Sequence, residues 1–247
     1  MPHDVAMTSV RPLVLAHRGD HRAATENSLA AFRAALALPG CDGLEFDVRL
    51  SADGVPVVIH DETLERTHGR RLRVAALTAD ALDDLGVPSL RAVLEIAGPA
   101  PFLDVELKED VAGPVVAALR EARGPDGGRT AVSSFDAEAL AHLGRVARGW
   151  RCWLNVDDLG GDTIGLAAEL GCAGIAARWE SVDTRAVARA RVAGLEVAAW
   201  TVTRTDTFER VARLGVIAVC VEGRALARLS GGSPPDERGM NGRPGTA

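Results

Sequence analysis

The sequence predicts a single (β/α)8 barrel, and three observations support this fold class. Short β-rich apolar runs alternate with segments of helical periodicity along most of the 247 residues, as expected for parallel strands covered by helices. The length also fits, since such barrels typically contain about 250 residues. No G-x-G-x-x-G follows the first strand, so a doubly wound open sheet is the less favoured alternative.

Each element has its own signal in the sequence. The barrel strands are predicted at residues 13–16, 43–49, 101–107, 129–134, 150–155, 173–177, 195–202 and 216–221. The helices are predicted at residues 27–38, 89–97, 110–122, 136–147, 161–170, 183–193, 205–214 and 223–229. Residues that commonly cap helix N-termini stand at several of the starts, namely Asn27, Ser89, Asp136, Asp162 and Asp183. Gly171, Gly194 and Gly215 stand where three helices should end.

One further apolar run, at residues 55–61, does not fit the count of barrel strands. It follows the second strand too closely for a crossover helix, which needs about a dozen residues. Asp53-Gly54 is typical of a two-residue hairpin turn, so the run should fold back antiparallel above the barrel. With only those two residues in the loop, His60 faces Asp47 on one side of the hairpin. A bulge would shift this register by one position.

The charge balance and the cysteines limit the possible partners and chemistry. The chain has 28 Lys and Arg against 34 Asp and Glu, a net charge of −6, and no basic run. This argues against nucleic acid as a partner and is compatible with a small anionic substrate. The four cysteines form no C-x-x-C pair. They are therefore interpreted as buried thiols in a reducing compartment, without a structural zinc site.

Residues 1–229 are predicted to form one domain, with an insertion at about residues 55–88 after the second strand. The tail at residues 230–247 is rich in Gly and Pro and is predicted to be disordered. The first residues do not resemble a secretion signal. No run approaches the roughly 18 apolar residues of a transmembrane helix. The expected location is therefore the cytoplasm, and the sequence indicates no particular oligomeric state.

Charged side chains mark the ends of three consecutive predicted strands. The first strand ends in His17-Arg18, the second carries Glu45-x-Asp47, and the third ends in the run Asp104–Lys108. In barrels of this kind the functional groups lie at the C-terminal ends of the strands. These residues should therefore meet at one rim, with His60 added by the hairpin.

The residue types at this rim suggest metal-assisted phosphate chemistry. Glu45, Asp47 and Glu106 offer only oxygen ligands, which suit Mg²⁺ or Ca²⁺ better than zinc. Two cationic side chains, Arg18 and Lys108, would offset the charge of a phosphate. Histidine ordinarily titrates near neutrality, so His17 and His60 could act as a general acid–base pair. Each residue alone also has an ordinary structural explanation, and it is their convergence that favours a functional site.

A series of motifs resembles the glycerophosphodiester phosphodiesterase family. In order they are LAHRG, ENS, LEFDVRLSADGVPVVIHDETLERT, VPSLRAVLE, FLDVELK, VSSFD and AAWTV, and they span most of residues 13–229. The resemblance implies a (β/α)8 barrel with an insertion after the second strand. It also implies metal-dependent hydrolysis of glycerophosphodiesters to glycerol 3-phosphate and an alcohol.

The resemblance assigns roles to individual residues. His17 and His60 would be the acid–base pair, and Glu45, Asp47 and Glu106 would hold one divalent cation, Mg²⁺ or Ca²⁺. The substrate would be bound by Arg18, Glu26, Asn27, Lys108 and Trp200. The chain departs from the family pattern at Val221-Glu222, where a Thr-Asp pair is usual, and at Thr203, where Asn is common. These departures concern the pocket for the alcohol.

Two other functions remain open from the sequence. The same site could act on lysophospholipids as a phospholipase D-like enzyme, with the apolar insertion contacting a lipid chain. The chain could also bind a phosphate-containing ligand without catalysis, although the presence of both histidines and all three acids argues against this. Product analysis on glycerophosphocholine and lysophosphatidylcholine would separate the two enzymes.

Overall fold

The computed structural model describes residues 11–228, and the predicted disordered tail at residues 230–247 lies outside them. Eight parallel strands pair in chain order, and the last strand pairs with the first, so the sheet closes into the predicted barrel. The strands are β1 (Leu13–His17), β2 (Gly43–Leu50), β4 (Phe102–Leu107), β5 (Thr130–Ser134), β6 (Cys152–Val156), β7 (Gly174–Arg178), β8 (Glu196–Val202) and β9 (Ala218–Val221).

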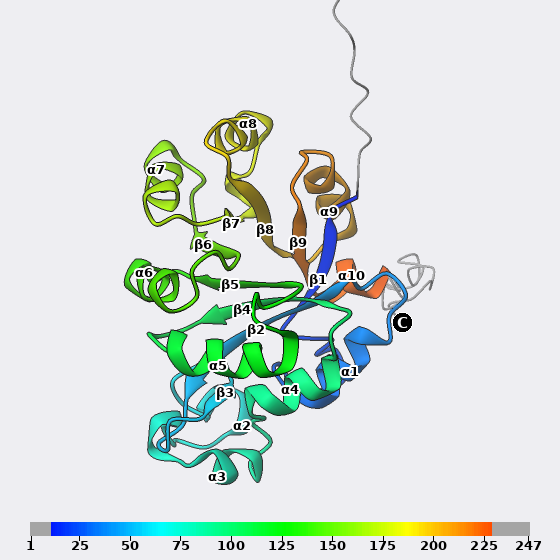
Figure 1. Cartoon of the computed structure of the whole chain (residues 1–247). Coiled ribbons are helices and arrows are strands. Elements are labelled where there is room, and N and C mark those ends of the chain that lie inside the picture. The colour runs from blue at the N-terminus through cyan, green and yellow to red at the C-terminus, as the bar shows by residue number, and fades with distance from the viewer. Residues whose placement is uncertain (1–10, 229–247) are drawn as a thin grey trace, which may run out of the picture.

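Helices follow the strands and cover the outside of the barrel (Figure 1). They are α1 (Leu29–Leu36), α4 (Leu90–Ala97), α5 (Ala112–Arg123), α6 (Ala137–Val146), α7 (Gly161–Glu169), α8 (Thr184–Val192), α9 (Thr205–Ala212) and α10 (Gly223–Ala227), with a short 3-10 helix η2 (Trp179–Ser181) after β7. None of the helices between residues 11 and 228 is long and apolar enough to cross a membrane.

Three of the five predicted N-caps are confirmed, because Ser89, Asp136 and Asp183 each accept a backbone N–H of the first helical turn. The first helix is capped by Ser28 instead of Asn27. Asn27 adopts a left-handed conformation, with φ 57°, and its side chain bonds elsewhere. The seventh helix begins after Gly160, so Asp162 lies within its first turn and is not the cap.

The interior of the barrel is filled at the N-terminal end of the strands and is lined by small residues above. Phe102 and Trp153 stack there, with ring centroids 5.6 Å apart, and Trp153 has no solvent exposure. The Trp153 indole N–H donates to Glu196 at the start of β8. Several alanines continue the same apolar cluster along the barrel interior, namely Ala131, Ala176, Ala198 and Ala218. This aromatic plug closes one end of the barrel, so a ligand can enter only from the other.

The insertion after β2 forms a separate small unit at one end of the molecule (Figure 1). It contains β3 (Pro56–Val58), α2 (Glu65–His68), the 3-10 helix η1 (Val74–Ala76) and α3 (Ala79–Asp83). Six buried side chains form its own apolar core, namely Val57, Ile59, Leu64, Val74, Leu82 and Val87. As predicted, β3 runs antiparallel to the end of β2 and is not a barrel strand.

The register of this hairpin differs by one residue from the prediction. Val58 pairs with Val48, and the N–H of Ile59 donates to the carbonyl of Asp47. Position 59, and not His60, is therefore the position opposite Asp47. The reason is a loop that includes Ala52 as well as the predicted pair, with Gly54 left-handed at φ 77°, the conformation that closes a three-residue hairpin with a bulge.

Candidate active site

The pairing of β1, β2 and β4 brings charged side chains from three strands into neighbouring rows. His17 pairs with Glu45, which pairs with Asp104 on its other side. Two residues further along, Asp47 pairs with Glu106. Since alternate residues of a strand share one face, both rows point to the same side of the sheet. They lie at the open end of the barrel, as predicted for the rim.

A cavity of about 200 Å³ opens above these rows. Seven of the predicted site residues line it, namely His17, Arg18, Glu45, His60, Glu106, Lys108 and Trp200. Asp104, Phe135 and Asn155 also line it and were not among the predicted site residues. The hairpin thus delivers His60 to the same cavity as His17 despite the shifted register. A larger hollow of about 330 Å³ lies between α4 and α5 and is lined by none of the predicted residues.

Three buried carboxylates crowd together beneath the cavity. Glu45, Asp47 and Glu106 each offer an oxygen within 4.8 Å of the others. Burial, together with repulsion from its acidic neighbours, raises the pKa of Glu45 well above its usual range, and the same causes raise the pKa of Glu106. Asp47 is fully buried, and its Oδ1 has no hydrogen-bond partner. Converging oxygens with an unsatisfied acceptor fit a hard divalent cation, so the donor set agrees with Mg²⁺ or Ca²⁺.

Asp104 is a fourth buried acid next to this group. Its carboxylate accepts a hydrogen bond from the Ser133 hydroxyl at 2.6 Å. Burial raises the pKa of Asp104 to about 7, an effect that the bond from Ser133 only partly opposes. Crowding of the four acids thus favours the protonated form of three of them, Glu45, Asp104 and Glu106, unless positive charge is nearby.

Arg18 and Lys108 supply positive charge at the same place. The Nε of Arg18 lies 3.0 Å from Asp47 Oδ2, and its Nη1 donates to Glu26 Oε1 at 2.9 Å. Lys108 Nζ lies 2.6 Å from Glu106 Oε1 and 3.7 Å from Asp47 Oδ1. Both cations are mostly buried yet line the cavity, so they can contact an anion that enters it.

Each histidine of the predicted pair is held by a carboxylate at Nδ1. His17 Nδ1 lies 2.8 Å from Glu222 Oε2, and His60 Nδ1 lies 2.7 Å from Asp61 Oδ1. Contacts with His17 and His21 lower the pKa of Glu222, while Arg66 lowers that of Asp61 to about 2. Both carboxylates are therefore ionised at neutral pH and can only accept, so each Nδ1 carries the proton. In the neutral form of either ring, Nε2 is then the nitrogen that carries no proton.

Three predicted site residues do not line the cavity. Asp47 lies below it, among the carboxylates. Asn27 is buried and donates through Nδ2 to Asp47 Oδ2 at 2.8 Å. Glu26 accepts bonds from Arg18 and from Arg66, which lower its pKa to about 2 despite its partial burial. Glu26 and Asn27 thus support Arg18 and Asp47 from outside the cavity lining, and their substrate-binding role stays a prediction.

The side chains that hold the two histidines, Asp61 and Glu222, are not among the predicted site residues. Their positions in the sequence could have marked them, because Asp61 directly follows His60 and Glu222 directly follows the last strand. Arg66 bonds to Asp61 and, across 40 residues of sequence, to Glu26, and no sequence pattern marks the second contact. His21 Nε2 lies 3.4 Å from Glu222 Oε2, on the other side of the same carboxylate.

The open end of the barrel gathers two imidazoles, two cations and four acids around one cavity. Such a group of side chains at this end of a (β/α)8 barrel is typical of an enzyme active site. The sequence profile of the glycerophosphoryl diester phosphodiesterase family matches residues 17–223. The chain belongs to this family, as the sequence motifs predicted. The predicted fold and the prediction of an enzyme of this class are confirmed with it.

Individual relatives agree with this assignment. A glycerophosphodiester phosphodiesterase of Caldanaerobacter subterraneus subsp. tengcongensis is 28% identical over 233 residues, covering 86% of this chain and 95% of the relative. The structure of a glycerophosphodiester phosphodiesterase from Agrobacterium tumefaciens superposes with a TM-score of 0.75 at 28% identity, covering 87% and 98% of the two chains. A phosphodiesterase from Oleispira antarctica, solved in complex with the product sn-glycerol-3-phosphate, superposes with a TM-score of 0.76 at 26% identity, covering 85% and 93%.

Proposed function

We propose that this enzyme hydrolyses glycerophosphodiesters to glycerol 3-phosphate and an alcohol, with a divalent cation and with His17 and His60 as the acid–base pair. The observation that carries the proposal is the convergence on one cavity of two carboxylate-held histidines and a buried acid cluster. Membership of the family supports the substrate class. The glycerol phosphate bound in the Oleispira relative supports the same class of product.

Glu45, Asp47 and Glu106 are the residues that would hold the cation. When bound, a divalent cation neutralises negative charge on a phosphodiester and polarises its phosphorus–oxygen bonds. Arg18 and Lys108 line the same cavity and contact the phosphate in this proposal, adding positive charge where charge develops in the transition state.

The two histidines move protons on either side of the phosphate. Because Glu222 and Asp61 fix the Nδ1–H of each ring, Nε2 of one can accept a proton from the attacking hydroxyl group. The other ring, protonated at Nε2, gives its proton to the leaving alkoxide. Either histidine fits either role. The attacking group is water or the 2-hydroxyl group of the substrate.

Trp200 and Phe135 form the apolar wall of the cavity and suit the carbon skeleton of the substrate. The Trp200 N–H already donates to the carbonyl of Ala176 at 2.8 Å, so the indole presents its ring and not its donor. The Phe135 ring meets it edge-on, with centroids 5.5 Å apart. Phe135 is 47% exposed, which places it at the mouth.

A coupled assay for glycerol 3-phosphate release tests this function on glycerophosphocholine and glycerophosphoethanolamine. Activity should vanish with a chelator and return with Mg²⁺ or Ca²⁺. His17→Ala and His60→Ala should each lower turnover by about 10²–10⁴-fold with the fold unchanged, because general acid–base catalysis typically contributes that much. His142→Ala is the control, since His142 pairs with Asp110 away from the cavity.

Two results would refute the proposal. Full activity in the chelator would exclude a required divalent cation. Normal turnover in His17→Ala or His60→Ala would exclude these two histidines as the acid–base pair. Lysophosphatidylcholine as the preferred substrate would instead support the phospholipase D-like alternative.

A further inference from the structure

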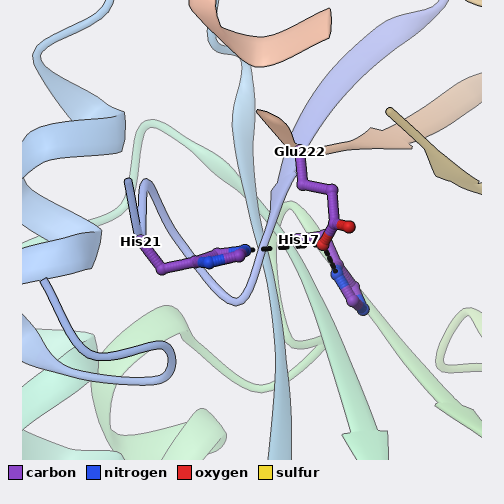
Figure 2. Close-up of side chains that lie close together, drawn as sticks. All are labelled: His17, His21 and Glu222. Carbon is purple, nitrogen blue, oxygen red and sulfur yellow. Dashed lines mark hydrogen bonds and ion pairs between the residues drawn. The ribbon is translucent and has the colours of Figure 1, made fainter. Parts of the chain in front are cut away.

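A second group of metal-type ligands lies on the far edge of the His17 ring, away from the acid cluster. His17 comes from the end of β1, His21 from the loop that follows, and Glu222 from the start of α10. One nitrogen of each histidine and one oxygen of Glu222 lie within 4.8 Å of one another. Figure 2 shows the two rings approaching the same carboxylate from two sides.

The donor atoms of this group differ in kind from those beneath the cavity. Two imidazoles and one carboxylate are typical ligands of Zn²⁺ and of related late transition metals, whereas Mg²⁺ and Ca²⁺ prefer oxygen alone. Three protein ligands with a fourth position left to water are also the usual set for a zinc ion that is not purely structural. The group can therefore select a cation that the acid cluster does not favour.

The spacing is close to that of such an ion, with the His17–Glu222 distance about 0.5 Å too short. Zinc binds nitrogen and oxygen at about 2.0–2.2 Å, so tetrahedral ligand atoms lie about 3.3–3.6 Å apart. Here Glu222 Oε2 lies 2.8 Å from His17 Nδ1 and 3.4 Å from His21 Nε2. The side chains of His17, His21 and Glu222 are 17%, 30% and 28% exposed, so an ion from solvent can reach them.

We propose that His17, His21 and Glu222 form a second cation site, suited to zinc-like transition metals, and that its occupation inhibits the enzyme. The metal would take the Nδ1 of His17, which in the metal-free protein carries a proton and bonds to Glu222. Binding there moves the single proton of the neutral ring from Nδ1 to Nε2 through solvent. His21 would bind through Nε2 and would then carry its one proton at Nδ1.

Inhibition follows from the changed His17 ring. With Nδ1 bound to metal and Nε2 protonated, the ring has no free nitrogen to accept a proton. It is also a weaker proton donor than an imidazolium, because the remaining proton sits on an uncharged imidazole. The inhibitory half of the inference therefore rests on the proposed function, whereas metal binding itself does not.

His21 separates this site from the proposed chemistry. It does not line the cavity, and its described polar contact at the site is with Glu222. His21→Gln should therefore remove a metal ligand and leave the His17–Glu222 contact in place. His142→Gln is a matched control, because His142 is also a partly exposed histidine beside a single carboxylate, with a 32% exposed side chain.

The test uses the full chain without an affinity tag, in excess Mg²⁺ so that the acid cluster is supplied with its preferred class of ion. Co²⁺ is titrated in and its visible absorption is recorded, and Zn²⁺ binding is measured by calorimetry. The wild-type chain and His142→Gln should bind one equivalent with the intense bands of a tetrahedral Co²⁺ site. His21→Gln should bind at least about tenfold more weakly, since even outer-shell changes cost that much.

Inhibition is then measured against buffered free Zn²⁺. The midpoint should shift by the same factor in His21→Gln, while its uninhibited turnover stays within about twofold of wild type. Equal Co²⁺ and Zn²⁺ binding by the wild-type chain and His21→Gln would overturn the proposed site. Equal inhibition of the wild-type chain and His21→Gln by Zn²⁺ would place the inhibitory metal elsewhere. It would overturn the proposal that occupation of this site inhibits the enzyme. If the chain turned over no glycerophosphodiester, the cobalt titration would still decide whether the site exists.

Discussion

Arg66 holds two parts of the site together without lining the cavity. Its guanidinium bonds to both oxygens of Asp61, at 2.7 and 3.1 Å, and to both oxygens of Glu26, at 2.7 and 2.9 Å. Asp61 holds His60, and Glu26 holds Arg18. Arg66→Gln should therefore loosen a proposed acid–base residue and a proposed phosphate contact at the same time.

The size of the effect follows from these contacts. Bonds between charged groups contribute more than neutral ones, but the Arg66 side chain is 48% exposed and solvent weakens its pairs. The expected loss in the free energy of unfolding is thus about 1–2 kcal/mol. Displacing His60 and Arg18 slightly should lower kcat/KM by about 10–100-fold. That is about 1.4–2.7 kcal/mol of transition-state stabilisation.

The measurement combines glycerol 3-phosphate release with urea unfolding. Arg71→Gln is the control, because Arg71 lies in the same insertion and makes one exposed ion pair, with Glu65 at 2.8 Å. It should stay within about twofold of wild type in activity and within about 0.5 kcal/mol in stability. If Arg66→Gln matched Arg71→Gln in kcat/KM, the reasoning that the ion-pair chain positions the site would be refuted.

Three further predictions concern stability. The pKa values of Glu26 and Asp61 are lowered to about 2, below their unfolded values, so the stability they add should be lost as pH falls from about 4.5 to 2. Across that pH range the free energy of unfolding, measured with urea, should fall less steeply in Arg66→Gln than in the wild-type chain. Equal slopes in the two chains would contradict this prediction. The pKa of Asp104 is raised to about 7, so without a cation keeping it protonated in the folded state should cost about 3–4 kcal/mol of stability as pH rises from about 4 to 7. Asp104→Asn, whose amide oxygen still accepts from Ser133, should remove that pH dependence in chelator. If the stability of the variant and of the wild-type chain changed in parallel with pH, the raised pKa of the buried acid would be contradicted. Trp153→Ala should destabilise the chain by about 3–5 kcal/mol through the cavity it leaves. Activity per folded molecule should persist, and its loss would show that the plug also shapes the site.

Local sequence patterns were sufficient to predict the barrel. Each strand is a short apolar run and each helix has a periodic apolar face, and these signals are read within about a dozen residues. The boundaries agree to within a few residues. The rim was also predictable, because the ends of neighbouring parallel strands must meet at one edge.

The details that were missed depend on contacts between distant residues or on single loop conformations. One extra loop residue, Ala52, moved His60 by one register position, and the Asp53-Gly54 pattern alone does not distinguish the two loops. The contact of His17 with Glu222 joins residues 205 positions apart. Asn27 is a good helix cap by type, but its bond to Asp47 requires a conformation that excludes capping.

The separate apolar core of the insertion has a consequence for how activity is lost. Its six buried side chains pack with one another and form a cluster apart from the main core. Small clusters of this kind can open as cooperative units at lower free energy than the whole domain. Opening the insertion would carry His60 and Asp61 away while the eight-stranded barrel stays closed. Gentle heating should therefore abolish turnover before it melts the barrel, and amide hydrogens of the insertion should exchange ahead of those in β4 to β9.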